Sequence, residues 1–343
     1  MTVDVRRLAL PADDPAAFEA VLALQHADDA VRDPGDPPRP RREIAWFLFG
    51  PHPRKQHLVW LAERDGEPVG MAWANTESDA GDEFQLALLE LLVDPAHRRT
   101  GVGTALVAKA VPELVAIGQN SLATYPCAEI EVEAAEAMCA RYGLLHKQDE
   151  RCSRATVADI DADLLDRWVA AAPDHAPGYR LVQWEGVCPE EVAEAWCAAE
   201  MAMDDAPLDD FEYHRTQLDT VAQRKDDEAS AAAGFRVYRS LVLAPDGAPA
   251  GLSAILVHED RPQVAYQDDT GVLADHRGRR LGRWLKAANF QQVQAAHPEV
   301  TVVETFNAQS NPWMLSINVD MGFAPHHVYR AWQAPLDEVA ARL

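Results

Sequence analysis

At 343 residues the chain is too long for one comfortable hydrophobic core, and about two domains are the default expectation. The formal net charge is −24, from 55 acidic and 31 basic side chains, and such a surface repels nucleic acids and anionic membranes. These properties exclude nucleic-acid and membrane-surface functions and favour a cationic or amine-bearing partner, although an acidic surface also serves solubility alone.

The cysteines and the first residues of the chain indicate the cellular compartment in which we expect the protein. Cys127, Cys139, Cys152, Cys188 and Cys197 form no CxxC pair and have no histidine at zinc-ligand spacing, so we expect reduced thiols and no metal. The start of the chain lacks a long apolar segment, and no part of the sequence reads as a membrane span. We therefore expect a cytoplasmic protein, either a monomer or a homodimer, without nucleic-acid or membrane partners.

The predicted elements occur twice in the same order. Each copy begins with a strand and a helical region and continues with a hairpin, a buried strand and a long helix. A further strand, a helix and a closing strand complete it. In the first copy the strands and the long helix cover 4–8, 57–63, 68–74, 86–93 and 103–117, and the proline-rich insert 33–42 reads as a loop or a disordered segment. In the second copy the corresponding elements cover 179–184, 235–244, 250–257, 265–273 and 281–296.

Two segments of the sequence repeat each other closely. LLELLVDPAHRRTGVGTAL (88–106) is repeated in YQDDTGVLADHRGRRLGRWL (266–285), where it aligns without a gap with residues 267–285. The alignment places Gly103 on Gly282 and Glu90 on Asp269. Glycine, histidine, arginine and acidic positions agree in order over a long stretch, which indicates an ancestral duplication.

Strand, arginine- and glycine-containing turn, then helix is an arrangement that binds a diphosphate. Unpaired amides at the helix start point at the anion, and glycine lets the backbone approach it. The alternative is a plain glycine-containing connection with solvated arginines, against which the second copy argues. The turn residues are Arg98, Arg99, Thr100, Gly101, Val102, Gly103 and Thr104 in the first copy, and Arg277, Gly278, Arg279, Arg280, Leu281 and Gly282 in the second.

The first of these turns resembles motif A of the GNAT acetyltransferase superfamily, whose signature is Arg/Gln-x-x-Gly-x-Gly/Ala after the fourth strand. Arg98-x-x-Gly101-x-Gly103 matches the signature in full, whereas Arg280 occupies the central glycine position of the second copy. The second copy is also similar to the family's later motif, over residues 311–323. The resemblance covers most of both halves and is weakest in the opening helices.

The resemblance implies an α/β (α+β) fold of two tandem domains, each a mixed, mostly antiparallel twisted sheet flanked by helices. We expect an N-terminal domain over 1–157, a linker helix and boundary over 158–177, and a C-terminal domain over 178–343. The resemblance also implies acetyl-CoA, or another acyl-CoA, as co-substrate, with its diphosphate on the turn and its pantetheine along a splayed fourth strand. The further cofactor-binding residues that it implies are Leu92, Val93, Val272, Leu273 and Asn311.

Two departures from the family pattern concern the leaving thiolate. Typical members place a tyrosine acid in the helix that follows the motif asparagine. Asn318 stands at that place in the second copy and Cys139 in the first, where Val132 also replaces the motif asparagine. No tyrosine acid can be carried over, and Asn318 is the candidate at its position.

Amine acetylation needs a base for the ammonium proton and amides that polarise the thioester carbonyl. Glu90 and Asp269 occupy equivalent places on the predicted fourth strands and are the candidate bases. A carboxylate is unexpected in a run such as LLELLV, because burying it unpaired is costly; the alternative is a hydrogen bond to a neighbouring strand or to the partner domain. Asp268, on the opposite strand face, is a candidate for binding the substrate.

The segment MAMDDAPLDDFEY (201–213) is acidic. Asp204 and Asp205, followed by Asp209 and Asp210, would receive a cationic amine at the mouth of the second copy's cleft. A plain acidic connector explains them equally well.

The sequence therefore predicts an acetyl-CoA-dependent N-acetyltransferase that acts directly on the amine of a small, cationic molecule, such as an antibiotic of the aminoglycoside kind. A non-catalytic acyl-CoA-binding or sensing protein is favoured by the missing tyrosines and opposed by the two retained carboxylates. A transferase for protein amines is the third interpretation. The first copy keeps the better turn and the second the better later motif, and we slightly favour catalysis in the second.

Overall fold

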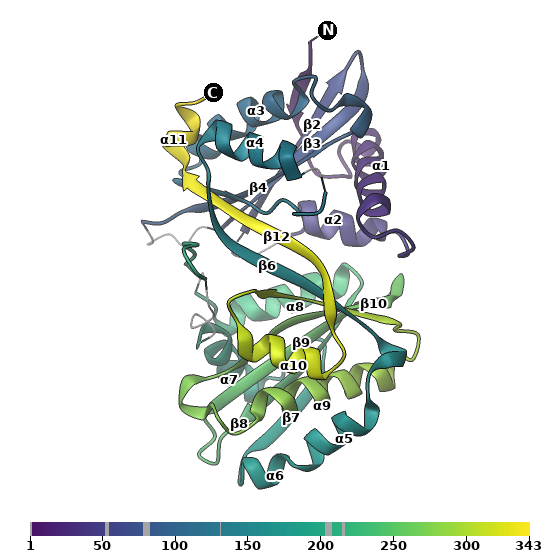
Figure 1. The fold of residues 1–343 in the computed structure, drawn as a ribbon, viewed down its shortest axis with the longest axis vertical. Coiled ribbons are helices and arrows are strands. Elements are labelled where there is room, and N and C mark those ends of the chain that lie inside the picture. Colours follow the sequence, from purple (N-terminus) through teal and green to yellow (C-terminus); the bar gives the residue numbers. More distant parts are fainter. Residues whose placement is uncertain (1, 52–54, 78–82, 131, 203–207, 215–216) are drawn as a thin grey trace. The chain divides into compact units, whose positions relative to one another are not determined.

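The computed structural model describes residues 2–51, 55–77, 83–130, 132–202, 208–214 and 217–343, which form two compact units (Figure 1). Unit 1 comprises Met1–Gln148, Asp209–Thr216 and Tyr329–Leu343, and unit 2 comprises Asp149–Leu208 and Gln217–Val328. Within the described ranges, no helix combines the length and apolarity that crossing a membrane requires.

The sheet of unit 1 is antiparallel except for one parallel pair. Its strands are β1 (Asp4–Arg7), β2 (Lys55–Arg64), β3 (Glu67–Glu77), β4 (Leu86–Val93), β5 (Ser121–Thr124) and the last part of β12 (Ala324–Pro335). Successive strands from β1 to β4 pair antiparallel, β4 and β5 pair parallel, and β5 pairs antiparallel with β12.

Helices cover both faces of this sheet, and β2 is therefore buried on both sides. The helices of unit 1 are α1 (Pro15–Arg32), α2 (Arg41–Phe49), α3 (Val102–Ala116), α4 (Val132–Tyr142) and α11 (Leu336–Ala340). Leu58 and Trp60 of β2 pack in one core with α3 and α11, whereas Val59 and Leu61 pack in the other with α1 and α2. Alternation along one strand thus fixes which helices lie on which face.

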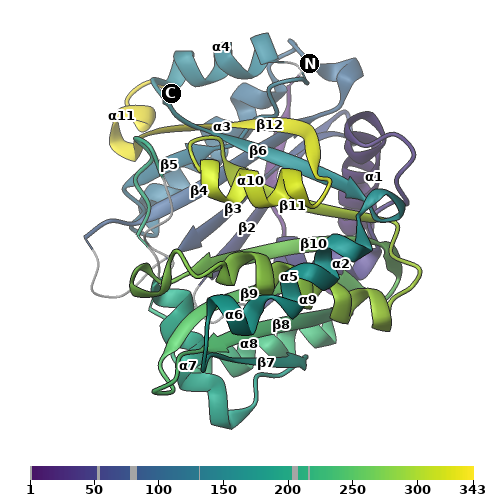
Figure 2. The same cartoon turned by 60° about the horizontal axis from the view of Figure 1, so that its bottom comes forward.

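Unit 2 repeats the plan. Its strands are the last part of β6 (Leu145–Thr156), β7 (Arg180–Glu185), β8 (Phe235–Leu243), β9 (Pro249–His258), β10 (Arg261–Val272) and β11 (Val302–Ala308). Its helices are α5 (Ala162–Ala170), α6 (Ala172–His175), α7 (Glu190–Met201), α8 (Thr220–Ala232), α9 (Leu281–Ala296) and α10 (Pro312–Asp320). Here β10 pairs parallel with β11, and the pairs β7–β8, β8–β9, β9–β10 and β6–β11 are antiparallel. Figure 2 shows α5 lying along α9, which packs on β8 and β9.

Each unit includes a strand from the other copy of the repeat. β6 follows α4 of the first copy, yet its residues 150–156 pair with β11 in unit 2. The last residues of β12, 332–335, pair with β5 in unit 1. The compact units are therefore discontinuous in sequence, whereas the ranges 1–157, 158–177 and 178–343 describe the copies and stay a prediction for the domains.

This architecture confirms the predicted α/β class, with two mixed, mostly antiparallel sheets flanked by helices. The predicted hairpin turns are present, with φ of 84° at Gly66 and 91° at Gly247. The insert 33–42 is not disordered: α2 begins at Arg41, and Arg39 Nε lies 2.8 Å from Asp29 Oδ2 of α1.

Candidate functional site

The two predicted turns have the same backbone shape. In the turn before α3, Arg99 and Gly101 have φ of 61° and 90°; in the turn before α9, Gly278 and Arg280 have φ of 81° and 57°. Each turn has two left-handed positions, one occupied by glycine and one by arginine. Glycine stands at the second position in the first copy and at the first position in the second copy. Arg280 therefore keeps the backbone of the central glycine that it replaces, at the strain cost of a left-handed side-chain residue.

The first arginine of each turn braces the preceding strand. Arg98 Nε donates to the Val93 carbonyl oxygen and Arg277 Nε donates to the Val272 carbonyl oxygen, both at 3.1 Å. The same bond in both units is independent support for the duplication. In both cases the arginine fixes where the strand ends and the turn begins.

The helices after the turns start without a capping side chain. The N-cap residues Gly101 and Arg280 are left-handed, and neither α3 nor α9 has a side-chain hydrogen bond at its first turn. A Cβ atom at Gly101 or Gly278 would meet nothing within 4 Å. Uncapped amides, the positive end of the helix dipole and open space together fit a diphosphate, so the turn residues can hold the one carried by CoA.

The last glycine of each turn has another purpose. A Cβ atom at Gly103 would lie 2.8 Å from Met138 Cε of α4, and one at Gly282 would lie 3.2 Å from Ile317 Cδ1 of α10. These two glycines therefore let neighbouring helices pack closely, and sequence reasoning that assigned them to ligand contact missed this constraint.

The strand before each turn parts from its parallel neighbour, and we call this parting the splay. β4 pairs with β5 only over residues 86–88, and β10 pairs with β11 only over residues 264–267. The rest of each strand, which includes the predicted cofactor residues Leu92, Val93 and Val272, has no described ladder partner on that side; Leu273 follows directly. Backbone amides at a splay are available to a ligand.

β10 contains a bulge that β4 lacks. Between the pairs Gln267–Ile255 and Thr270–Ser253, β10 has two residues, Asp268 and Asp269, and β9 has one. The Gln267 side chain supports the bulge, because its Nε2 donates to the Ala254 carbonyl oxygen at 2.7 Å and lies 3.3 Å from that of Asp268.

The bulge changes the equivalence of the candidate bases. In unit 1 a single residue, Glu90, faces Trp73 of β3 in a regular ladder. Glu90 therefore corresponds to the pair Asp268-Asp269 rather than to Asp269 alone, which the ungapped alignment did not show. Asp269 is partly buried and Asp268 is exposed.

Glu90 bridges the splay of unit 1. Its Oε1 accepts from the Tyr125 amide at 2.7 Å, and Oε2 lies 3.4 Å from Thr124 Oγ1 at the end of β5. Burial raises the pKa of Glu90 to about 7, while these two donors and the charge of Arg32 act in the opposite direction. The hydrogen bond to a neighbouring strand, foreseen as the alternative role, is therefore present.

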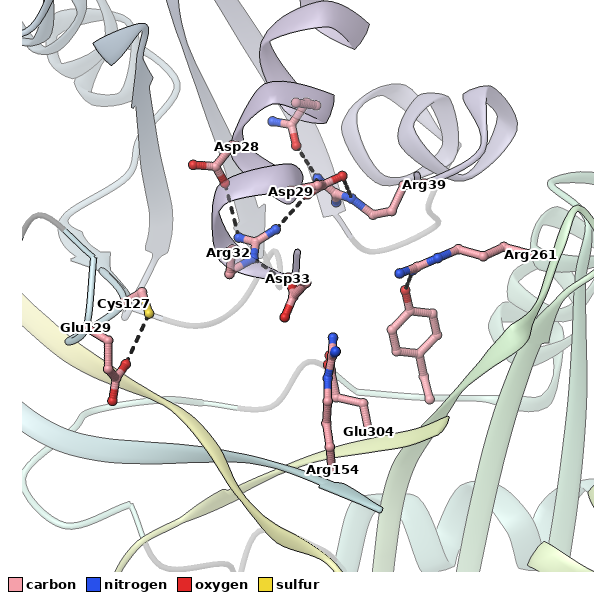
Figure 3. Close-up of polar contacts among 12 residues, drawn as sticks. Asp28, Asp29, Arg32, Asp33, Arg39, Cys127, Glu129, Arg154, Arg261 and Glu304 are labelled. Carbon is pink, nitrogen blue, oxygen red and sulfur yellow. Dashed lines mark hydrogen bonds and ion pairs between the residues drawn. The ribbon is translucent and has the colours of Figure 1, made fainter. Parts of the chain in front are cut away.

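Sequence reasoning missed the charge cluster around Arg32 at the end of α1. Figure 3 shows Arg32 facing Asp28 and Asp29, at 3.3 and 2.7 Å. Burial raises the pKa of Asp28, and Arg32 opposes the shift. Arg32 also acts on Glu90, whose pKa its charge lowers. No local sequence signal marks the cluster, because its members are ordinary surface residue types.

The predicted role of the acidic segment stays a prediction. Asp204 and Asp205 lie outside the described residues. Asp209 and Asp210 belong to unit 1, where the Asp210 amide lies 3.4 Å from the Lys147 carbonyl oxygen. They therefore do not share a unit with Asp268, the other predicted substrate ligand.

The later motif of the second copy is built around two asparagines. Asn311 Oδ1 accepts from the Met314 amide at 3.2 Å and so caps α10. Asn318 is 1% exposed and contacts Lys286 and Asn307, two residues that sequence reasoning missed. A lysine inside the otherwise buried face of α9 was the signal that could have found this cluster.

Cys139, at the tyrosine position of the first copy, is buried. Burial raises the pKa of its thiol to about 12, and the nearby charge of Glu90 raises it as well. A thiol so hard to ionise is not a nucleophile at neutral pH. The first copy thus lacks both an acid and a nucleophile at this place.

Two splayed sheets, each followed by an amide-lined turn and an uncapped helix, define a tandem α/β acyltransferase fold. Residues 20–143 match the Acetyltransferase (GNAT) family. Over 319 residues the chain is 30% identical to a mycothiol acetyltransferase of Nocardia farcinica, covering 93% of each protein. The chain belongs to the GNAT acetyltransferase family.

Solved structures share the fold. A tandem GNAT protein from the clavulanic acid biosynthesis pathway superposes with a TM-score of 0.79 and 25% identity, over 98% of this chain and 99% of that one. A GCN5-related N-acetyltransferase from Sphaerobacter thermophilus, 18% identical, superposes with a TM-score of 0.65 over 97% and 96% of the two chains. The chain is thus an acyltransferase of a family that uses acetyl-CoA as co-substrate, rather than the non-catalytic sensor that its missing tyrosines also allowed.

Proposed function

We propose that the chain transfers the acetyl group of acetyl-CoA directly to the amine of a small, cationic acceptor, and that unit 2 carries the reaction. The observation that carries this proposal is the bulge at Asp268 and Asp269, which lies where β10 parts from β11. A bulge turns strand residues out of the regular ladder, so a carboxylate and backbone groups outside that ladder meet at one place. In unit 1 the corresponding strand forms a regular ladder, and its carboxylate, that of Glu90, accepts a hydrogen bond from the Tyr125 amide.

Asp269 is the proposed base. The acceptor arrives as an ammonium ion and must lose a proton before its nitrogen can attack, and a partly buried carboxylate beside the splay supports that step, directly or through water. Backbone amides of the parted strand support polarisation of the acyl carbonyl. The activated acyl group itself is supplied by acetyl-CoA.

The turn of unit 2 is the proposed diphosphate site. Residues 277–280 precede the uncapped start of α9, Leu281 and Gly282 begin that helix, and Val272 and Leu273 lead into the turn. Arg280, being exposed and left-handed, leaves the helix amides uncovered. Asn311 supports the site indirectly, by fixing the start of α10.

The acceptor is inferred from charge. A net charge of −24 attracts cations, which supports a polyamine-like acceptor. The full-length match to a mycothiol acetyltransferase favours a second candidate, the amine acceptor of those enzymes. Both candidates keep the same chemistry, direct transfer to a primary amine.

Two measurements test the proposal. Millimolar acetyl-CoA should raise the melting temperature, because a ligand that binds only the folded state stabilises it; ATP at the same concentration controls for anions. Release of free CoA thiol should then follow addition of a polyamine or of the mycothiol-type amine, and a matched polyol should give none. No shift and no thiol release would refute the proposal, and release with peptide amines alone would redirect it to protein acceptors.

A further inference from the structure

Lys286 is a buried cation without a counter-charge. It is 1% exposed in the middle of α9. Its Nζ lies 2.6 Å from Asn318 Oδ1, 4.0 Å from Met314 Sδ and 5.5 Å from the centre of the Phe323 ring, and no carboxylate of the described residues pairs with it. Burying an ammonium in this way costs stability, so packing alone does not account for a lysine here.

The lysine determines how the Asn318 amide is oriented. In its ammonium form the lysine has only donors, so the amide oxygen of Asn318 faces it, as the 2.6 Å contact has it, and the NH2 group faces away. Asn318 Nδ2 donates one N–H to Asn307 Oδ1 at 2.7 Å. The second N–H has no partner among the described residues.

This network lies at the splay of unit 2. Asn307 follows Thr305, the last residue of β11 that pairs with β10, by two positions. Asp269 likewise follows Gln267, the last paired residue of β10. The Asn318 amide, held between Lys286 and Asn307, is therefore tied to the end of β11 that parts from β10.

We propose that Lys286 is a positioning residue that holds the Asn318 NH2 group toward the splay, where it donates a hydrogen bond to the thiolate that leaves the acetyl group. This inference rests on the function proposed above. As the nitrogen–carbon bond forms and the carbon–sulfur bond breaks, the sulfur keeps the electron pair, the base takes the nitrogen proton, and solvent later protonates the thiolate. Asn318 donates a hydrogen bond to the thiolate but transfers no proton to it. The oriented amide group thus stabilises the leaving thiolate in place of a tyrosine acid.

A double-mutant cycle on steady-state thiol release tests the link between the two residues. Lys286→Met should lower kcat by about tenfold or more while KM for acetyl-CoA changes by less than about twofold. Lys286→Gln, which can still donate to Asn318 Oδ1, should retain more activity. Lys286→Met should have no further effect when added to Asn318→Ala, because the lysine acts through the amide. Multiplying losses, or an unaffected Lys286→Met, would overturn the inference.

A binding measurement needs no acceptor. Calorimetry should show that the wild type prefers CoA over S-methyl-CoA, whose sulfur cannot ionise, and that Lys286→Met and Asn318→Ala lose this preference together. An equal preference in all proteins, or none in the wild type, would overturn the inference. Any binding in unit 1 is the same in the wild type and the variants, so it cancels when they are compared. Thermal unfolding controls for folding, and Lys286→Gln carries the test if the methionine variant is unstable. If the wild type releases CoA thiol and the Lys286 variants release it at the same rate, this inference is refuted and the proposed function stands.

Discussion

Burial moves the pKa values of Glu90 and Lys286 toward neutrality from opposite sides, to about 7 in each case. For Glu90 the shift is offset in part by the Tyr125 amide, by Thr124 and by Arg32. For Lys286 no opposing cause accompanies desolvation. Glu90 lies at the splay of unit 1 and Lys286 lies beneath the Asn318 amide of unit 2, and in both places burial makes the charge costly.

Glu90→Gln should stabilise the protein at neutral and higher pH. The pKa of Glu90 is higher in the folded state than in the unfolded one, so the folded protein loses stability as pH rises from about 4.5 to about 7. Glutamine keeps the acceptor for the Tyr125 amide but does not ionise, and should add on the order of 1 kcal/mol above pH 7. Urea unfolding across pH measures this, and a variant that is less stable than the wild type at alkaline pH would contradict it.

Lys286→Met should have the opposite pH signature. The pKa of Lys286 is lower in the folded state, so the wild type gains stability as pH rises from about 7 toward 10.5 and lacks that gain below 7. The methionine variant should therefore exceed the wild type most clearly below pH 7, by about 1–3 kcal/mol, with the gap closing at alkaline pH. The same unfolding series measures it, and a gap independent of pH would show that Lys286 is not buried as an ammonium.

At the scale of elements, the strand, turn and helix of each copy form one structural motif. Arg98 and Arg277 fix the strand end, two left-handed residues reverse the chain, and an uncapped helix follows. The sequence predicted this motif because its determinants are local. It could not predict the bulge of β10, because one inserted residue leaves a strand's composition unchanged and only the ladder with β9 reveals it. Nor does any local pattern tell that Asn318 faces Lys286, which lies on another helix.

Arg280→Gly tests the strain in the second turn. Glycine adopts the observed φ of 57° without a steric penalty, so the variant should be more stable by about 0.5–1 kcal/mol. Gly278→Ala is the matched control and should lose about 1 kcal/mol, because φ there is 81°. Denaturant midpoints report both, and a loss of stability in Arg280→Gly would show that its side chain supports the turn.

At the scale of the whole molecule, the exchange of closing strands makes each unit depend on the other copy of the repeat. The paired strands β6 and β11 are joined in unit 2 by Arg154 and Glu304, whose Nε and Oε2 atoms are 2.6 Å apart (Figure 3). In unit 1 the end of the chain supplies β12 and α11, with Leu336 and Val339 fully buried against α3. Repeats in the sequence predict the element order but not this pairing, because both copies offer equivalent partners.

Leu336→Ala should therefore destabilise unit 1, although it lies at the far end of the sequence. Truncating a fully buried leucine leaves a cavity and should cost about 2–5 kcal/mol. Hydrogen exchange should show lost protection in α3 and β5, while Leu343→Ala, at a residue 49% exposed, should leave it unchanged. Loss confined to unit 2 would contradict the described exchange.

The central claim, that unit 2 acetylates an amine with Asp269 as base, is tested most directly by the rate of CoA thiol release in Asp269→Asn. Asparagine keeps the size of the side chain and removes its basicity, so kcat should fall by about 100-fold or more while acetyl-CoA still raises the melting temperature. Glu90→Gln, measured beside it, reports on unit 1. An Asp269→Asn protein as active as the wild type, with activity lost in Glu90→Gln instead, would contradict the account and move the chemistry to unit 1.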